Sequence, residues 1–178
     1  MKGTINHIPP FATQHTYMLA SIYPYGTEKA ANEWAFQGEI RYTWKRGTAM
    51  GGRYGTTLKL NASHIRGTGD RWWEMTKEPY YTDVNIELNK KINKQWYIGA
   101  MAMYQTYNKS VIEGHGDLVR AGIGVVEAKY AINKNVQMRA ELQYLYTKQD
   151  MGQWMAALYE LSLWRKLVFS GQWMYNIG

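Results

Sequence analysis

The sequence predicts an all-β fold: an antiparallel up-and-down transmembrane β-barrel, or a segment of one, with about 8–10 strands. Three observations predict it. Apolar and polar residues alternate, Trp and Tyr gather near the ends of the alternating segments, and the connections differ in length. Alternation with a period of two marks strands with two different faces, and aromatic girdles mark the membrane interfaces of such barrels.

The clearest alternating segment covers residues 33–45. Its even-numbered positions from Trp34 to Trp44 are apolar or glycine, and its odd-numbered positions are charged or polar apart from Ala35. The same pattern predicts further strands at residues 16–23 (the weakest), 53–63, 82–89, 96–107, 119–131, 137–146, 154–163 and 168–176. Within 119–131 the apolar positions change phase after Val125, and we expect a β-bulge there.

The connections between these segments alternate in length. We expect short turns at residues 90–95, 132–135 and 164–167, and longer loops at 67–81, 108–117 and 147–153. Short turns at one end and longer loops at the other are typical of an up-and-down membrane barrel. Residues 27–36 and 153–167 can also be drawn as helices. The first segment begins with good helix formers and a candidate cap at Thr27, and in the second apolar side chains recur at helical spacing.

We expect residues 1–178 to form a single β-barrel segment that belongs to a longer barrel. A count of about nine strands is unusual, because bacterial single-chain barrels have even strand numbers. No apolar core of a signal peptide follows Lys2. The residues Asn176, Ile177 and Gly178 resemble a chain that stops within a protein.

Composition excludes several classes of site. The 178 residues have room for one domain, and the absence of Cys excludes disulfides, thiolate metal sites and cysteine nucleophiles. No apolar run approaches the ~18 residues of a membrane helix. The net charge of +7 is spread over turns and polar faces without a concentrated run, so we expect no nucleic-acid partner.

The polar faces of the strands carry charges of both signs. A soluble β-sandwich would expose these charges to bulk water, whereas a wide barrel would turn them into a lumen where opposite charges can pair. We therefore predict that nine side chains face a lumen: Glu39, Arg41, Lys59, Asp83, Glu87, Glu127, Lys129, Arg139 and Glu141.

We expect no catalytic site, no metal site and no cofactor. Ser63 and His64 are adjacent in a strand and point to opposite faces, and no G-x-S-x-G motif is present. Glu113, His115 and Asp117 share one glycine-containing loop. A metal site needs a larger set of ligands in a fixed shell, so an exposed turn is the expected structure there.

Six short segments carry a family resemblance: residues 36–40, 54–57, 105–109, 114–116, 141–144 and 147–150. Through them the chain resembles an uncharacterised, porin-like outer-membrane β-barrel family of Bacteroidales-type bacteria, over residues 5–178. The resemblance implies the C-terminal part of a longer barrel in the bacterial outer membrane, in contact with the lipid bilayer. Lipopolysaccharide and other outer-membrane proteins are further candidate partners. The family has no established activity or functional residues to carry over.

These patterns predict a passive role, as a porin-like channel or a membrane scaffold, and no enzymatic activity. Two alternatives remain open. One is a non-conducting outer-membrane binding protein that works through its external loops, where Trp72 and Trp73 could stack on a sugar, contact lipid or pack as a lid. The other is a soluble lipocalin-like barrel that holds an apolar ligand with its apolar faces inside.

Overall fold

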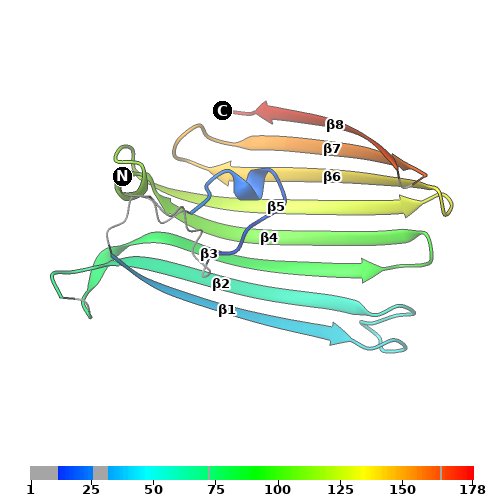
Figure 1. The fold of residues 1–178 in the computed structure, drawn as a ribbon, viewed down its shortest axis with the longest axis horizontal. Coiled ribbons are helices and arrows are strands. Elements are labelled where there is room, and N and C mark those ends of the chain that lie inside the picture. The colour runs from blue at the N-terminus through cyan, green and yellow to red at the C-terminus, as the bar shows by residue number, and fades with distance from the viewer. Residues whose placement is uncertain (1–11, 26–31, 72, 165) are drawn as a thin grey trace.

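The protein forms one antiparallel sheet of eight strands in the order β1 to β8 (Figure 1). The computed structural model describes residues 12–25, 32–71, 73–164 and 166–178. The strands are β1 (Glu33–Trp44), β2 (Thr56–Thr68), β3 (Met75–Lys91), β4 (Trp96–Asn108), β5 (Leu118–Ala131), β6 (Val136–Thr147), β7 (Trp154–Leu163) and β8 (Leu167–Asn176). Each strand pairs with the next along the chain, so the prediction of an all-β antiparallel meander is confirmed.

The connections lie at two ends of the sheet. We call the end with residues 45–55, 92–95, 132–135 and 164–166 the turn end, and the end with 69–74, 109–117 and 148–153 the loop end. The turn end lies at the right of Figure 1 and the loop end at the left. The predicted alternation of lengths is wrong at two places: 45–55 is the longest connection, and β3 begins at Met75, which shortens the predicted loop 67–81.

Glycine conformation explains why residues 53–55 do not belong to β2. Gly47, Gly52 and Gly55 have φ values of 82°, 57° and 88°. Such left-handed backbone favours glycine. The backbone then folds on itself, because Gly52 N–H donates to Thr48 O and Gly55 N–H donates to Gly51 O. The alternation at Arg53 and Tyr54 therefore continues into a folded connection.

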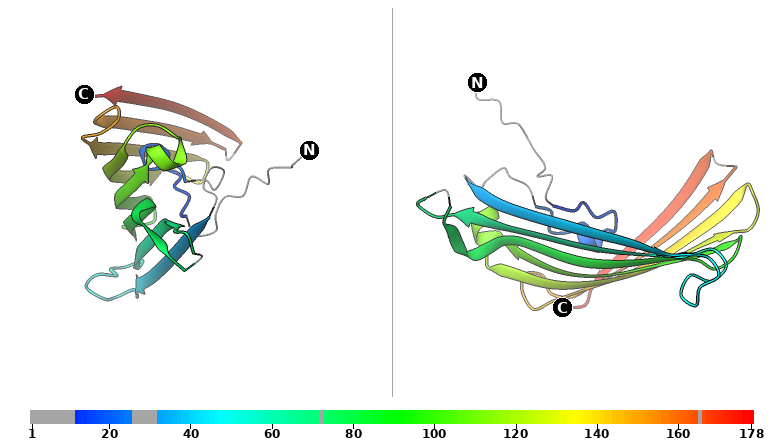
Figure 2. Two further views of the ribbon diagram at one scale, coloured as in Figure 1. Left: turned by 90° about the vertical axis from the view of Figure 1, so that its left-hand side faces the viewer. Right: turned by 90° about the horizontal axis from the view of Figure 1, so that it is seen from below.

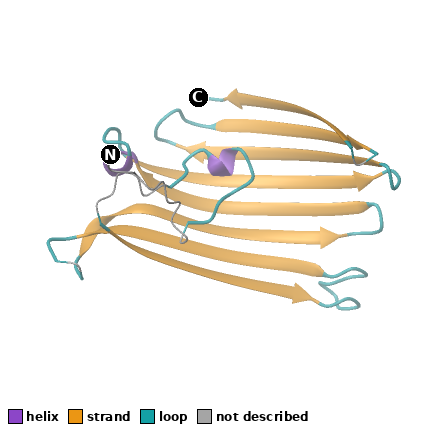
Figure 3. Cartoon of the chain, viewed as in Figure 1, coloured by secondary structure: helices purple, strands orange, loops and turns teal. Residues whose placement is uncertain are grey.

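Residues 12–25 cross the concave side of the curved sheet (Figure 2), and we call them the strap. The prediction of a strand at residues 16–23 is wrong. This part contains the short 3-10 helix η1 (Leu19–Ser21), and a second short helix, α1 (Lys109–Ile112), lies in a connection at the loop end (Figure 3). Leu19 and Ala20 of η1 are buried against the sheet. The apolar residues at 16–23 therefore pack from a helical turn and not from a strand.

The predicted β-bulge at Val125 is absent, and the prediction is wrong. Val125 pairs with Met101 on one side and Gln143 on the other, and neither ladder shifts its register there. After Val125 the inner face of β5 changes from apolar to charged residues, and the outer face becomes apolar. The strand continues without an extra residue. Irregular pairing occurs instead between β2 and β3, beside Arg66.

The sheet curves but is not closed into a barrel by hydrogen bonds (Figure 2). β1 and β8 form its two edges. The helical alternative for residues 153–167 is wrong, because Trp154–Leu163 is strand β7. The alternative for 27–36 is wrong over Glu33 to Phe36, which belong to β1, and residues 27–31 lie outside the described part.

Candidate functional site

The two faces of the sheet carry different side chains. We call the face that the strap covers in part the inner face, and the opposite one the outer face. The outer face exposes a large apolar side chain on every strand, namely Ile40, Leu60, Ile86, Ile98, Val126, Leu142, Tyr159 and Trp173. Val126 is 54% exposed there, whereas Asp83 on the inner face is 0% exposed. Large contiguous apolar surface is rare on proteins that face water.

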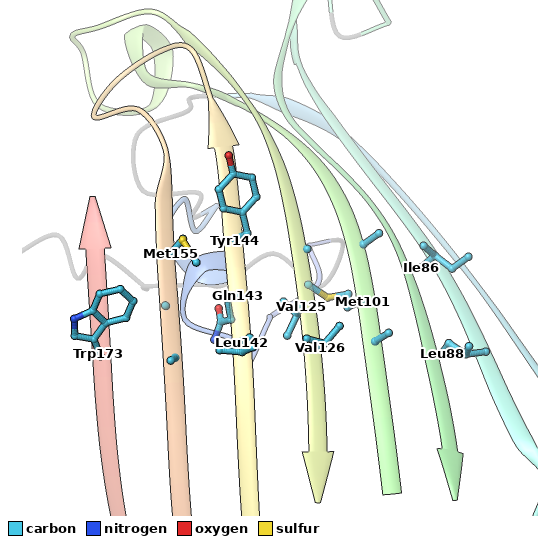
Figure 4. A pocket seen from close by; sticks show the side chains of 15 residues that line it. Ile86, Leu88, Met101, Val125, Val126, Leu142, Gln143, Tyr144, Met155 and Trp173 are labelled. Carbon is cyan, nitrogen blue, oxygen red and sulfur yellow. The ribbon is translucent and has the colours of Figure 1, made fainter. Parts of the chain in front are cut away.

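The outer face is hollowed across β3 to β8 (Figure 4). The hollow has a volume of about 490 Å³ and is lined almost entirely by apolar side chains. Small residues such as Ala100, Ala102 and Gly124 line it together with larger ones such as Leu142 and Trp173. The outer face therefore offers an uneven apolar surface rather than a flat one.

Arg139 is the centre of a charged cluster on the inner face, in the half of the sheet nearer the turn end. Its Nε lies 2.6 Å from Glu127 Oε2, its Nη2 lies 2.5 Å from Glu141 Oε2, and its Nη1 lies 2.8 Å from Glu160 Oε2. Lys129 Nζ is 3.0 Å from the other oxygen of Glu127. Side chains from β5, β6 and β7 meet because directly paired residues point to the same face.

A second charged group lies across β1, β2 and β3. Lys59 Nζ is 3.5 Å from Glu39 Oε2 and 3.5 Å from Glu87 Oε1. Arg41 Nη2 is 3.7 Å from Glu39 Oε1, and its side chain is 64% exposed. Exposed pairs of this kind contribute little to stability, about 0–1 kcal/mol each. Their effect is to hold charges of both signs on one surface.

All nine predicted lumen residues lie on the inner face. Eight belong to the two charged groups, and Asp83 lies apart from them beneath the strap. Sequence reasoning missed Glu160, which binds Arg139. The period-two pattern could have found it, but its face neighbours Ala156 and Leu158 are apolar. Whether these residues line a water-filled lumen stays a prediction.

The strap is bound to the inner face through polar contacts. His15 Nε2 contacts the buried carboxylate of Asp83, and Thr13 Oγ1 donates to Asn61 Oδ1 at 2.6 Å. Leu19 N–H donates to Gln143 Oε1 at 2.7 Å. Each contact joins residues far apart in the sequence, so no local pattern could have revealed it.

The polar surface beneath the strap is incompletely paired. Asn61 Nδ2, Asn85 Oδ1 and Gln105 Oε1 are buried and make no hydrogen bond to the described residues. A buried polar group without a partner costs about 1–3 kcal/mol. Release of the strap would let water reach these groups.

Burial makes the hydroxyl groups of the strap tyrosines weaker acids than an exposed phenol. Burial, reinforced by the nearby Glu127 and Glu141, raises the pKa of the Tyr17 hydroxyl to about 12. Burial and the hydrogen bond to Asp150, at 3.0 Å, raise the pKa of Tyr23. Burial and the hydrogen bond to Glu33 raise the pKa of Tyr25. All three phenols therefore stay neutral at ordinary pH while the strap is docked.

The predicted contact residues of the external loop are only partly described. Trp72 lies outside the described residues. Trp73 is 54% exposed at the loop end, and the guanidinium carbon of Arg71 lies 5.5 Å from its ring centroid. An exposed indole stacked by a cation is compatible with each of the three predicted uses, which stay predictions.

Two further observations concern membranes and metals. In the part of the chain that the structure describes, no helix is both long and apolar enough to cross a membrane. The same residues contain no group of three or more His, Cys, Asp or Glu side chains placed to hold a metal ion. Within the loop of Glu113, His115 and Asp117, His115 Nδ1 lies 3.6 Å from Glu113 Oε2.

Among the comparisons with known proteins, only the comparison with family models gives a match. No curated protein and no solved structure matches the chain. One family model, described as a family of unknown function (DUF6029), matches residues 1–178. The expected resemblance to an uncharacterised family is confirmed to that extent, whereas a porin-like character and a Bacteroidales source stay predictions. The chain belongs to the DUF6029 family.

Proposed function

We propose that the chain is an integral outer-membrane β-barrel protein, or a segment of one, with a passive role as a porin-like channel or scaffold. The observation that carries the proposal is the distribution of side chains between the two faces. Apolar side chains are exposed on the outer face of all eight strands, while the inner face carries the charged and amide side chains together with apolar ones that are buried beneath the strap. This order matches a wall with lipid outside and a polar interior.

Strand length supports the same proposal. A tilted strand needs about 9–11 residues to cross a bilayer. The shortest strands, β7 and β8, have 10 residues each, and β3 has 17. Every strand of the sheet is therefore long enough to span.

The free edges set a requirement for this proposal. An unpaired strand edge in lipid leaves backbone groups without partners, at several kcal/mol for each group. β1 and β8 must then pair, with each other or with other strands. A closed barrel of about eight strands has an interior just wide enough for its own side chains or one small ligand. The strap on the inner face favours a wider barrel.

The soluble lipocalin-like alternative fits the structure less well. It needs the apolar faces inside, around a ligand. The apolar row from Ile40 to Trp173 lies on the face opposite the strap, which occupies the concave side (Figure 2). The curvature of the sheet therefore favours lipid rather than an enclosed ligand as the neighbour of the apolar face.

A non-conducting binding protein is the second candidate, and the docked strap favours it. The strap covers part of the inner face and would narrow a path along it. The working surface would then be the loop end, with Trp73 exposed. Lipopolysaccharide or other outer-membrane proteins are the partners that such a surface would meet.

Folding in detergent tests the proposal. We expect circular dichroism to report β structure, and a gel to show a heat-modifiable band, only when detergent or lipid is present. A soluble monomeric β protein without detergent would overturn the proposal.

Conductance then separates the two roles. If the chain forms a channel, Arg41→Glu and Arg139→Glu will shift the reversal potential toward cation selectivity, because each change adds negative charge to the inner face. Absent conductance, with loss of partner binding after removal of residues 69–74, would support the binding role instead.

A further inference from the structure

The two ends of the sheet differ sharply in charge. The turn end carries eight described basic residues: Lys45, Arg46, Arg53, Lys90, Lys91, Lys94, Lys134 and Lys166. Its four connections, residues 45–55, 92–95, 132–135 and 164–166, contain no Asp or Glu. The connections of the loop end mix both signs, with Asp70, Glu74, Glu113, Asp117 and Asp150 beside Arg71, Lys109 and Lys148. The net charge of +7 is therefore concentrated at one end.

Two turns hold a lysine in the same position. Asn93 Oδ1 accepts hydrogen bonds from the backbone N–H groups of Gln95 and Trp96, each at 2.8 Å. Asn133 Oδ1 accepts from Asn135 and Val136 N–H in the same way, at 2.8 and 2.9 Å. An Asn side chain that binds the following backbone stabilises a tight turn. The residue after each Asn, Lys94 or Lys134, is exposed at the tip.

The basic side chains of the turn end are not neutralised by acids. Among the described residues, none of the eight forms an ion pair with a carboxylate, whereas Lys109 at the loop end lies 3.0 Å from Asp150. Three have contacts that leave the charge in place. Lys90 Nζ donates to Met50 O at 3.3 Å, and the ring centroid of Tyr54 lies 5.4 Å from Lys91 Nζ and 5.8 Å from the guanidinium carbon of Arg53. Their positive charge remains available to a partner outside the sheet.

Exposed aromatic side chains lie beside these lysines. Trp96 follows Lys94 by two residues and is 42% exposed, and Trp164 precedes Lys166 and is 59% exposed. The apolar outer face begins next to them, at Ile98 on β4. The order along the strand is thus apolar, then aromatic, then basic. Trp favours the boundary between hydrocarbon and water, and basic side chains just beyond it reach lipid phosphates.

We propose that the turn end binds the anionic phosphate headgroups of the leaflet that surrounds it. The inference rests on the proposed function, because it needs the outer face to be in lipid. Beyond the proposed function, it identifies the end of the sheet that meets an anionic surface and the residues that make the contact. A nucleic acid is the less suitable partner, because the charges sit on separate turns along the rim of an apolar face and form no groove.

The experiment uses the full chain with two sets of vesicles, phosphatidylcholine alone and phosphatidylcholine with phosphatidylglycerol. The test variant is Lys94→Gln/Lys134→Gln/Lys166→Gln, which removes one charge from each of three turns. The matched control, Arg71→Gln/Arg120→Gln/Lys148→Gln, removes the same charge near the loop end. Circular dichroism and the heat-modifiable band report insertion, and vesicle co-sedimentation reports affinity before insertion.

We expect insertion into both vesicles and tighter binding by the wild-type chain when phosphatidylglycerol is present. The gain will fall as salt is raised from about 0.1 M to about 0.5 M, because salt screens the attraction. The test variant will lose about fivefold in affinity for each removed charge, and the control will lose much less.

Three results overturn the inference. One is equal affinity for both vesicles, and another is an equal loss in the control variant. The third is an affinity for single-stranded DNA that matches the affinity for anionic vesicles. Normal insertion together with any of them refutes only this inference. Failure to insert into either vesicle refutes the proposed function and this inference with it.

Discussion

Two neighbouring residues of β1, Ile40 and Arg41, lie on opposite faces of the sheet. Ile40 points outward and is 67% exposed, and Arg41 points inward with a side chain that is 64% exposed. Exposure alone therefore does not distinguish the faces at this strand. Chemistry does: the apolar residue belongs to a row that continues over all eight strands, and the charged one to a group that pairs charges of both signs. This chemical difference is the basis of the proposal that the outer face lies in lipid and the inner face in a polar interior.

The largest expected effect is that of a charge placed on the outer face. In detergent or lipid, Val126→Arg should destabilise the fold by about 2–4 kcal/mol, the range for a cation at the lipid-facing centre of a barrel. The measurement is the free energy of unfolding in urea with the protein in lipid vesicles. Ser170→Arg is the matched control, because Ser170 faces inward opposite Glu160. Equal effects of the two changes would remove the distinction between the faces.

The next effect concerns the Arg139 cluster on the inner face. Arg139→Met leaves Glu127, Glu141 and Glu160 without their shared cation, and should cost about 2–3 kcal/mol. This lies below the range for fully buried pairs, because the Arg139 side chain is 28% exposed. The double variant Arg139→Met/Glu141→Gln should recover part of the loss in the same unfolding measurement. No recovery would show that Arg139 acts through packing rather than charge.

A smaller effect is expected at the strap. His15→Ala removes the contact with Asp83 and should raise the rate of limited proteolysis within residues 12–25, on the order of tenfold for a loss of about 1.4 kcal/mol. The sheet itself should keep its circular dichroism spectrum. His115→Ala is the control, since His115 lies in an exposed loop. An unchanged proteolysis rate would mean that this contact does not hold the strap.

The smallest effect is a dependence on pH. The pKa values of Tyr17, Tyr23 and Tyr25 are raised in the docked strap, to about 12 for Tyr17. The ordinary value is about 10, so between about pH 10 and about pH 12 the docked strap holds more protons than the released one. Docking is then weakened as pH rises through this range and is unaffected below it.

A fluorophore on Ser21→Cys can follow this release. Its access to a water-soluble quencher should rise above about pH 10. Addition of Tyr17→Phe should move the rise to higher pH, since one ionising phenol is gone. Release near neutral pH would contradict a role for these tyrosines.

Much of the fold could be predicted from the sequence, because a strand with two different faces leaves a local signal. The alternation from Glu33 to Trp44 placed β1 and its faces correctly, and the nine charged candidates all lie on one face. Glu160 was not predicted, because a single charged residue among apolar neighbours does not produce a polar face in the alternation of β7.

Features that depend on distant contacts could not be predicted. The strap resembles a strand locally, and its position is set by contacts such as His15 with Asp83, 68 residues away. Whether the outer edges of β1 and β8 find partners likewise has no local signal in the sequence. At Val125 the sequence pattern predicted a bulge because apolar residues move from one face to the other there, although the pairing itself is regular.

The most direct test of the central claim compares the two faces at β1. Because the chain contains no Cys, Ile40→Cys and Arg41→Cys each give one attachment point for a fluorophore. Both variants are reconstituted in vesicles whose acyl chains carry a quencher, and a water-soluble quencher is added in a separate run. We predict strong lipid quenching at position 40 and strong aqueous quenching at position 41. Equal quenching by the aqueous reagent at both positions would contradict the claim that the outer face lies in lipid.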